Sequence, residues 1–327
     1  MLAGIFKPAQ CVGFFFWSDL VRYGIPYKGS KNTIAKKIIN FLPEGETLVD
    51  ICAGGCAITH AALEHMEQNP LTKKWNRVIA NDINPMPLRL FGDAVNGKYA
   101  NEKRWISRED FFRLKEKDAY VKFCWSFGNN GRNYLYAKEI EPWKRALHYA
   151  YVLGDTGFLS EICGTVPKDN IRQWIRDNEK NIKEKYISWY KEQWKLAHSQ
   201  GHLLFLQRMQ SLESLQRLQR LQSLESLESL ERLELYCDSY ENVRIPDNSV
   251  IYADIPYEGT DCGSYESFNH KEFYDWAARQ KNIYISSYEI KDPRFICVYG
   301  IPKRQNSAAG GYGKKIIERI YTVRNHS

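Results

Sequence analysis

The chain has 327 residues, of which 43% are hydrophobic and 14% aromatic, with a formal net charge of +7 and a pI near 8.8. This length and apolar content exclude a disordered chain and predict a globular protein, with one large domain carrying a smaller one. The basic charge favours polyanionic partners without indicating a fold. Eight scattered cysteines do not form a disulfide framework, so we expect reduced thiols in a cytosol.

Residues 1–22 lack the regularity of the rest of the chain. Their one apolar run, residues 14–17, is too short to span a membrane, and no small-residue cleavage site follows it. We therefore expect a loosely attached N-terminal extension on a cytoplasmic protein that has no membrane association.

From residue 23 the sequence alternates between predicted helices and strands. Residues 25–43 contain a glycine turn, a candidate helix N-cap at Ser30 and then apolar residues at helical spacing, until Pro43 ends the helix. Residues 48–51 form an apolar strand that leads through a glycine turn into a second helix. The next strand, residues 78–80, stops at Asn81 and Asp82.

Further strands are predicted late in the chain, in the segments 233–240, 249–257, 282–288, 294–300 and 314–323. Alternating strands and helices predict an α/β fold whose parallel sheet is covered on both faces and binds ligands at the carboxyl ends of its strands. Asp50 and Asp82 both fall at such ends.

Between these halves, residues 101–233 show a different pattern, which we interpret as a helical insertion. Within residues 168–196 apolar residues recur at helical intervals among many lysines and arginines. Within residues 206–233 leucine, once replaced by methionine, recurs every third residue, and one face of an α-helix cannot hold that period. A helix with spiralling leucines and a small solenoid are alternatives, but we expect a repeat-expanded spacer without chemistry.

The segment DIPY, residues 254–257, ends an apolar strand with a carboxylate, a carbonyl, a proline and an aromatic ring. This combination suits a flat ring that carries an amino group, because the ring can stack on the aromatic side chain while carboxylate and carbonyl accept the two N–H bonds. A capped proline turn would have the same residues, so the motif alone leaves both interpretations open.

The motifs around it, taken in order, resemble those of the adenine-specific DNA methyltransferases. DIPY resembles the Asp-Pro-Pro-Tyr motif of that family, and YKGSK (27–31), DICAGGCA (50–57), ANDIN (80–84) and CDSY (237–240) resemble its S-adenosylmethionine motifs. SFGNNGRNYLY (126–136) is similar to the start of its target-recognition region. SSYE and AAGGYGKKIIERIY resemble its C-terminal strands.

The resemblance implies a Rossmann-like methyltransferase sheet built from residues 23–100 and 234–327, with residues 101–233 inserted as a DNA-recognition region. It implies methyl transfer from S-adenosylmethionine to the 6-amino group of adenine in double-stranded DNA, with the target base flipped out of the helix. Asp50 would receive the amino group of the cofactor, Lys31 its carboxylate and Asp82 its ribose hydroxyls. The implied catalytic residues are Asp254, Ile255, Pro256 and Tyr257; the other implied cofactor residues are Tyr27, Gly54, Gly55, Asp238 and Asp254; the candidate DNA contacts are Asn129, Asn130 and Arg132.

The sequence departs from the family pattern at Cys52, at Cys56 and at Ile255, which replaces the first proline of the catalytic motif. Alternatives are methylation of another amine, such as cytosine in DNA, adenine in RNA or a protein glutamine, and a catalytically dead DNA-binding homologue. Cys52, Cys56 and His60 have a spacing that could suit a metal, but Gly54 and Gly55 would break the helix such a site needs, so we expect no metal.

Overall fold

The computed structural model describes residues 22–194, 212–227, 230–258, 268–304 and 315–324. Seven strands form one sheet in the order β3-β2-β1-β4-β5-β7-β6. Their bounds are β1 Thr47–Asp50, β2 Arg77–Asn81, β3 Leu233–Tyr236, β4 Ser249–Ala253, β5 Ile283–Ser287, β6 Phe295–Arg304 and β7 Lys315–Val323. Each lies within or overlaps a strand that the sequence predicts. The predicted extension at residues 1–22 lies outside the described residues except for its last residue.

Side chains that alternate along the central strands build a core on each face of the sheet. Leu48 and Val250 belong to the core that α1 (Ala35–Phe41), α2 (Ala57–Gln68) and α3 (Pro85–Val95) cover. Val49 and Ile251, one residue further on, belong to the core under α12 (His270–Ala277). This period of two follows from the pleat, and burial on both faces explains why these strands are apolar throughout. The prediction of a doubly covered sheet is confirmed.

The predicted parallel sheet has an antiparallel part at one end. β1 pairs in parallel with β2 and β4, β2 with β3, and β4 with β5, whereas β7 runs antiparallel to both β5 and β6. β6 ends at Arg304 and β7 begins at Lys315, so their connection is shorter than the dozen or more residues that a crossover between parallel strands needs.

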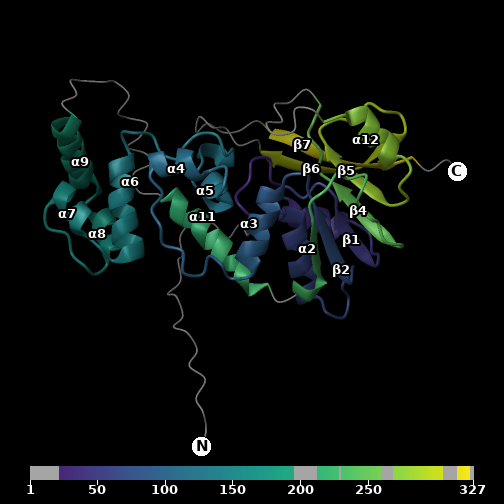
Figure 1. The fold of residues 1–327 in the computed structure, drawn as a ribbon, viewed down its shortest axis with the longest axis horizontal. Helices are drawn as coiled ribbons and strands as arrows, with labels where there is room; N and C mark the ends of the chain where they lie inside the picture. The colour runs from purple at the N-terminus through teal and green to yellow at the C-terminus, as the bar shows by residue number, and fades with distance from the viewer. Residues whose placement is uncertain (1–21, 195–211, 228–229, 259–267, 305–314, 325–327) are drawn as a thin grey trace, which may run out of the picture.

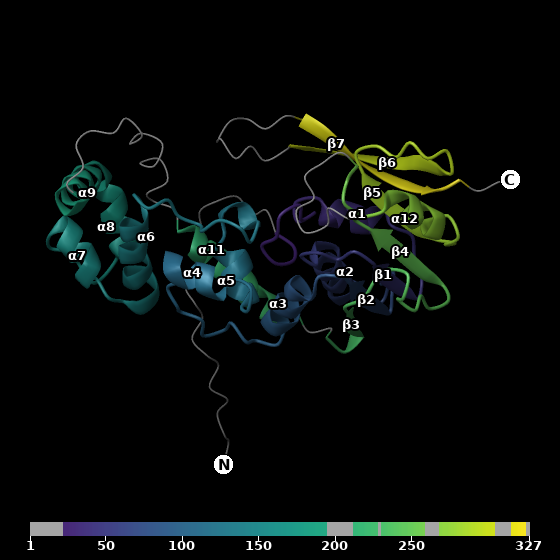
Figure 2. The ribbon, with the colours of Figure 1, turned by 45° about the horizontal axis from the view of Figure 1, so that its top comes forward.

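Helices fill most of the region between β2 and β3. The molecule is elongated, with the sheet at one end, α6 to α9 at the other, and α3, α4, α5 and α11 between them (Figures 1 and 2). The helices of this region are α4 Arg108–Leu114, α5 Ala119–Cys124, α6 Glu141–His148, the π-helix η2 Tyr149–Leu153, α7 Gly157–Cys163, α8 Ile171–Asp177, α9 Glu179–Trp194 and α11 Glu213–Gln222. Their buried apolar side chains belong to the same continuous core as α1 to α3.

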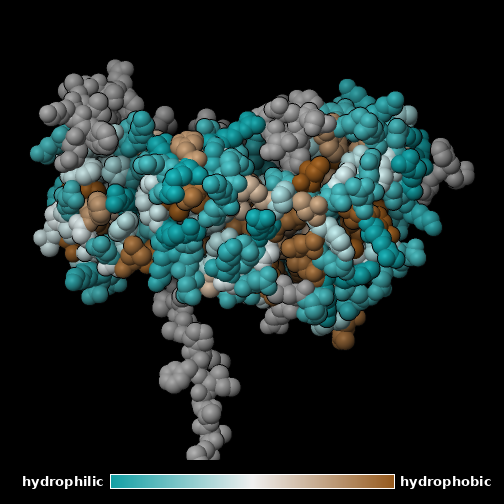
Figure 3. Space-filling view, viewed as in Figure 1, coloured by the Kyte–Doolittle hydropathy of each residue, from teal (hydrophilic) through white to brown (hydrophobic). Residues whose placement is uncertain are grey.

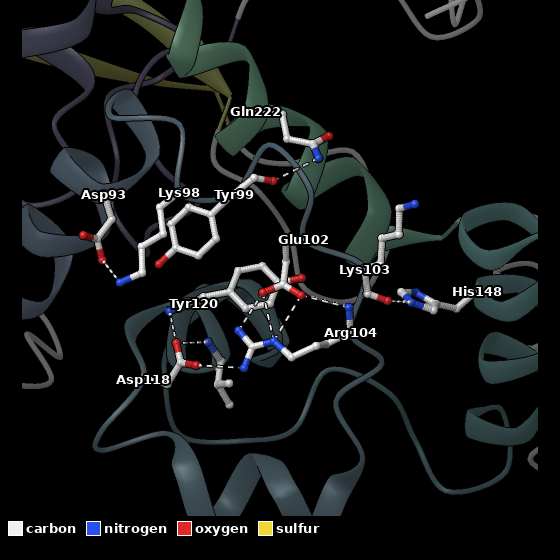
Figure 4. A network of polar contacts seen from close by, with 11 residues as sticks. Asp93, Lys98, Tyr99, Glu102, Lys103, Arg104, Asp118, Tyr120, His148 and Gln222 are labelled. Carbon is white, nitrogen blue, oxygen red and sulfur yellow. Dashed lines mark hydrogen bonds and ion pairs between the residues drawn. The ribbon is translucent and has the colours of Figure 1, made fainter.

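A polar network fixes the chain where it leaves α3 for these helices (Figure 4). The carbonyl of Tyr99 accepts a hydrogen bond from Gln222 of α11, and the carbonyl of Lys103 contacts His148 of α6 at 2.9 Å. Arg104 forms ion pairs with Glu102 and Asp118. The connection is therefore bonded to three helices, which limits movement of the helical region relative to the sheet.

The leucine repeat is a packed element, and the expectation of a spacer is wrong. Over the described part, residues 213–222 form α11 and the 3₁₀-helix η3 spans Ser223–Ser226. The buried leucines of this stretch are Leu212, Leu218, Leu221, Leu224 and Leu227. In α11 the apolar side chains turn around the axis, and the helix packs against both α3 and α5. The repeat residues 206–211 and 228–229 lie outside the described residues.

Four smaller findings complete the fold. The first helix begins at Ala35 with Ile34 at its N-cap, so Ser30 is not the cap that the sequence suggests. The described cysteines, Cys52, Cys56, Cys124, Cys163, Cys237 and Cys297, are free thiols. Among the described helices none is long and apolar enough to cross a membrane. Polar side chains cover most of the face in Figure 3, and apolar ones gather between α2 and α3.

Candidate active site

The carboxyl ends of the parallel strands bring the predicted acidic residues to one edge of the sheet. Asp50 ends β1, Asp82 follows β2 and Asp254 follows β4. The strand order reverses between β1 and β4, because the chain builds outward from β1 to β3 on one side and from β4 onward on the other. Crevices at such a reversal are where open α/β sheets bind ligands. The structure thus assembles the predicted site residues of three separate motifs.

Lys31 lies directly on the catalytic motif. Its Nζ is 2.5 and 2.6 Å from the two carboxylate oxygens of Asp254, and 5.1 Å from the centre of the Tyr257 ring. The lysine side chain is 5% exposed. Burial would lower the pKa of Lys31, but the carboxylates of Asp254 and Glu318 raise it above the usual value, so the ammonium stays charged. An N–H donor therefore already occupies the Asp254 carboxylate beside the aromatic ring.

Glu318 of β7 is a site residue that the sequence analysis did not single out. It is fully buried, and it accepts hydrogen bonds from the Tyr257 hydroxyl and, at 2.5 Å, from Ser286. Lys303 of β6 pairs with it, and Lys31 is 3.7 Å away. Burial raises the pKa of Glu318, but the two lysines outweigh burial and lower the pKa to about 2. A lone carboxylate inside a strand that is otherwise rich in isoleucine is the signal that could have indicated it.

Asp50 is a buried carboxylate with neutral partners. Its Oδ2 accepts from the backbone N–H of Thr59 at 3.2 Å and from the Thr59 hydroxyl at 2.7 Å. Within the described parts of the chain it forms no ion pair. Burial raises the pKa of Asp50 to about 7; the Thr59 hydrogen bonds oppose this shift, and the charges of Asp254 and Asp82 add to it. This side of the site thus has an excess of negative charge, which a cationic ligand group would relieve.

The glycine turn after β1 makes room for Tyr27. A Cβ atom on Gly55 would lie 2.6 Å from the Cβ of Tyr27, and one on Gly54 would lie 3.1 Å from its ring. The Tyr27 ring also packs edge-on against Phe123 of α5, with 5.3 Å between ring centres. The glycines thus admit a side chain of this protein, and the close approach of a cofactor to the same turn stays a prediction.

Asp82 links the turns after β1 and β2. Its Oδ2 accepts from the Gly54 N–H and its Oδ1 from the Asn84 N–H, each at 2.8 Å. Binding of ribose hydroxyls by Asp82 stays a prediction. Asp238 lies exposed beyond β3, where its carboxylate accepts from the Ser239 N–H and from Asn242. The backbone of Asp238 is held to the β2 end by Asn81.

The candidate DNA contacts lie on one hairpin. Ser126 pairs with Tyr134 in an isolated antiparallel bridge, and the tip between them contains three residues with positive φ, Gly128, Asn129 and Gly131. Arg132 is exposed, whereas Asn129 and Asn130 are partly buried. The Asn130 carboxamide accepts from the Arg132 and Asn133 backbone N–H groups, so Asn130 shapes the tip. The hairpin therefore presents the Arg132 side chain most openly.

The remaining residues of the catalytic motif have contacts that the sequence did not indicate. The Ile255 side chain is 2% exposed and packs into the core under α12. The Pro256 carbonyl is 2.7 Å from Nε2 of His270, at the start of α12. Ile255 therefore packs its side chain in the core and also supplies the motif with a backbone carbonyl. His270, to which the sequence analysis assigned no role, contacts the motif.

The class of protein follows from three features: the strand order of the sheet, the acidic side chains at its strand ends and the aspartate–tyrosine motif after β4. Together they are typical of the S-adenosylmethionine-dependent methyltransferases. Residues 27–152 match the family model described as D12 class N6 adenine-specific DNA methyltransferase. Residues 27–152 are therefore similar to a D12 class methyltransferase domain. A search of curated proteins finds no match to this chain.

The family match confirms the class of protein that the motifs predict. That family consists of enzymes that use S-adenosylmethionine to methylate the N6 atom of adenine in DNA. The matched residues include Tyr27, Asp50, Asp82 and the hairpin, and thus part of the region that the sequence analysis describes as an insertion. Asp254 to Tyr257 and Glu318 follow the matched residues in the chain.

Proposed function

We propose that this chain is an active adenine methyltransferase of double-stranded DNA and that its reaction takes place between Asp254 and Tyr257. The observation that carries the proposal is the position of the Lys31 ammonium. It donates to both oxygens of Asp254 and lies over the Tyr257 ring. The Asp254 carboxylate and the Tyr257 ring are therefore close enough for one N–H donor group to contact both, as the adenine amine would.

The acidic edge of the sheet fits S-adenosylmethionine by charge. The cofactor carries a sulfonium and an ammonium group, and when bound it supplies an electrophilic methyl group. Asp50 is the carboxylate suited to the ammonium, because it is buried and its pKa is raised by burial and by Asp254 and Asp82. Asp82 would accept the ribose hydroxyls and Asp238 the amine of the cofactor's adenine, while Tyr27, Gly54 and Gly55 line the turn between them.

Lys31 must leave Asp254 before an adenine amine can use the same oxygens. Glu318 is the acceptor within reach, since its Oε1 is already 3.7 Å from the ammonium. Asp254 and the Ile255 carbonyl then accept the two hydrogens of the amine, and the Tyr257 ring, held by its hydroxyl on Glu318, stacks against the base. Positioning is what the protein contributes, because attack on a sulfonium methyl needs no base to activate the amine.

The hairpin from Ser126 to Tyr134 is the proposed DNA contact, with Arg132, Asn129 and Asn130 at its tip. Residues 101–152, which carry this hairpin, contain eleven lysines and arginines against seven acidic residues, whereas residues 153–194 contain seven of each. The positive charge of the helical region thus lies in its first part. DNA phosphates would be contacted there, and a DNA-modifying enzyme of this kind would work in the cytoplasm.

Methyl incorporation into unmethylated duplex DNA tests the proposal. The wild-type protein should methylate adenine N6, and Asp254→Ala should lose at least about a hundredfold in turnover, because the amine loses its charged acceptor. Fold should be preserved, since Lys31 can pair with Glu318. Cofactor and DNA binding, measured separately, should both persist.

Asp275→Ala is the matched control, because it removes an aspartate of α12 that forms an ion pair with Arg294, which is not a residue of the motif. It should keep full turnover. A wild-type protein that binds cofactor and DNA yet transfers no methyl group would contradict the proposal and leave a DNA-binding homologue instead.

A further inference from the structure

The described part of the leucine repeat contains two arginines whose positions the fold and the family do not explain. Arg217 and Arg220 occupy the same place in two successive Leu-Gln-Arg triplets of α11, so they are three residues apart and lie on one side of the helix. Burial lowers the pKa of both guanidinium groups. Among the described residues neither forms an ion pair; both are held by backbone carbonyl oxygens.

Arg217 binds the base of the protein hairpin from Ser126 to Tyr134, which we propose to contact DNA. Its Nη1 donates to the carbonyls of Cys124 at 2.8 Å and Ser126 at 2.7 Å. Cys124 ends α5, where a carbonyl has no partner within its own helix. Ser126 closes the hairpin, because its hydroxyl accepts from the Gly131 N–H and it pairs with Tyr134. The orientation of the hairpin therefore depends on this guanidinium.

Arg220 holds the loop that leads into the cofactor motif. Its Nε donates to the Gly24 carbonyl at 2.6 Å, and its Nη2 donates to the Tyr23 carbonyl. The Gly24 N–H donates to His60 of α2, and the Ile25 N–H donates to the Gly55 carbonyl in the glycine turn. The loop is thus fixed between α11 and the turn after β1, three residues before Tyr27.

We propose that Arg217 and Arg220 are positioning residues that join the hairpin to the cofactor loop, so that each ligand binds more tightly when the other is present. One short helix bonds both segments, and ordering of either segment by its ligand reduces the entropy that the other must lose. Buried cations are costly, and the leucine that recurs in the repeat would pack at these positions without that cost. The inference rests on the proposed function in assigning cofactor and DNA to these two segments.

The test measures binding of S-adenosylhomocysteine, the demethylated cofactor, by calorimetry with and without saturating mixed-sequence unmethylated duplex DNA. In the wild-type protein we expect DNA to tighten this binding about fivefold or more. The quantity compared is the ratio of the affinity with DNA to the affinity without DNA. In Arg217→Met and in Arg220→Met this ratio should fall below about twofold, because each variant keeps the length of the side chain but loses its hydrogen-bond donors. Gln216→Met, on the exposed side of α11, should keep the wild-type ratio.

Lysine variants separate this role from loss of packing. Arg217 uses one terminal nitrogen for both carbonyls, which an ammonium can partly replace, whereas Arg220 uses two nitrogens. Arg217→Lys should therefore keep an intermediate ratio and Arg220→Lys should not. If the methionine variants fail to fold, the affinity ratios of the lysine variants test the inference in their place.

A wild-type ratio near one, or wild-type ratios in folded Arg217 and Arg220 variants, would overturn the inference. A wild-type protein that binds neither ligand would instead refute the proposed function.

Discussion

At the scale of single residues, the site is governed by carboxylates whose ionisation depends on their partners. Asp50 has a pKa of about 7 because burial raises it, while Glu318 has a pKa of about 2 because two lysines outweigh burial. A raised folded-state pKa means that the contribution of Asp50 to folding stability is complete below its ordinary value of 3.8 and is lost as the pH rises to about 7. A bound ammonium group would reverse this loss.

Cofactor affinity should therefore depend on pH through Asp50. We expect S-adenosylmethionine to bind more tightly as the pH rises from 5 to about 7, because the ionised carboxylate binds the ammonium and the protonated one does not. Asp50→Asn should bind weakly and without this dependence. Asp238→Asn, which changes an exposed carboxylate, should keep the wild-type dependence of cofactor affinity on pH. The same dependence in Asp50→Asn would exclude this role for Asp50.

At the scale of elements, the loop before the cofactor motif depends on a glycine. Gly24 has φ +68, and a Cβ there would lie 2.1 Å from the Gly55 carbonyl oxygen. Gly29 has a similar φ of +82 but nothing within 4 Å of its Cβ position. Both positions favour glycine by backbone conformation, but only Gly24 lies against the turn after β1.

The pair Gly24→Ala and Gly29→Ala should separate backbone strain from steric clash. Gly29→Ala should lower the free energy of unfolding by about 1 kcal/mol, the cost of the left-handed conformation alone. Gly24→Ala should lower it by about 1 to 3 kcal/mol more, because the backbone at Gly55 must shift. Chemical denaturation measures both, and equal losses would show that the close approach does not matter.

At the scale of the whole molecule, charge is distributed unevenly along its length. The excess of lysine and arginine lies in residues 101–152, which carry α4, α5 and α6, whereas α7 to α9 at the far end lie in a segment with balanced charge (Figure 1). DNA affinity should therefore fall with salt in proportion to the phosphates contacted near the hairpin, and α7 to α9 should contribute little to it.

Single lysine substitutions check this distribution. Lys117→Gln, which follows α4, should weaken DNA binding for all sequences alike and reduce the slope of log affinity against log salt by about one. Lys180→Gln in α9 is also exposed and should leave affinity and slope unchanged. The same loss from both substitutions would place DNA along the entire helical region.

The sequence by itself determined the strands, the carboxylates at their ends and the class of reaction. Asp50, Asp82 and Asp254 were predictable because an apolar run that stops at a carboxylate is a local pattern, and parallel strands bring such ends together. Only the tertiary structure decided which partners these carboxylates have. Lys31 meets Asp254 across 223 residues of chain, and Glu318 reaches Tyr257 because β7 returns antiparallel beside β5. The leucine repeat was misinterpreted for the same reason, since its threefold period describes no single helix face, and contacts with α3 and α5 on different sides determine its fold.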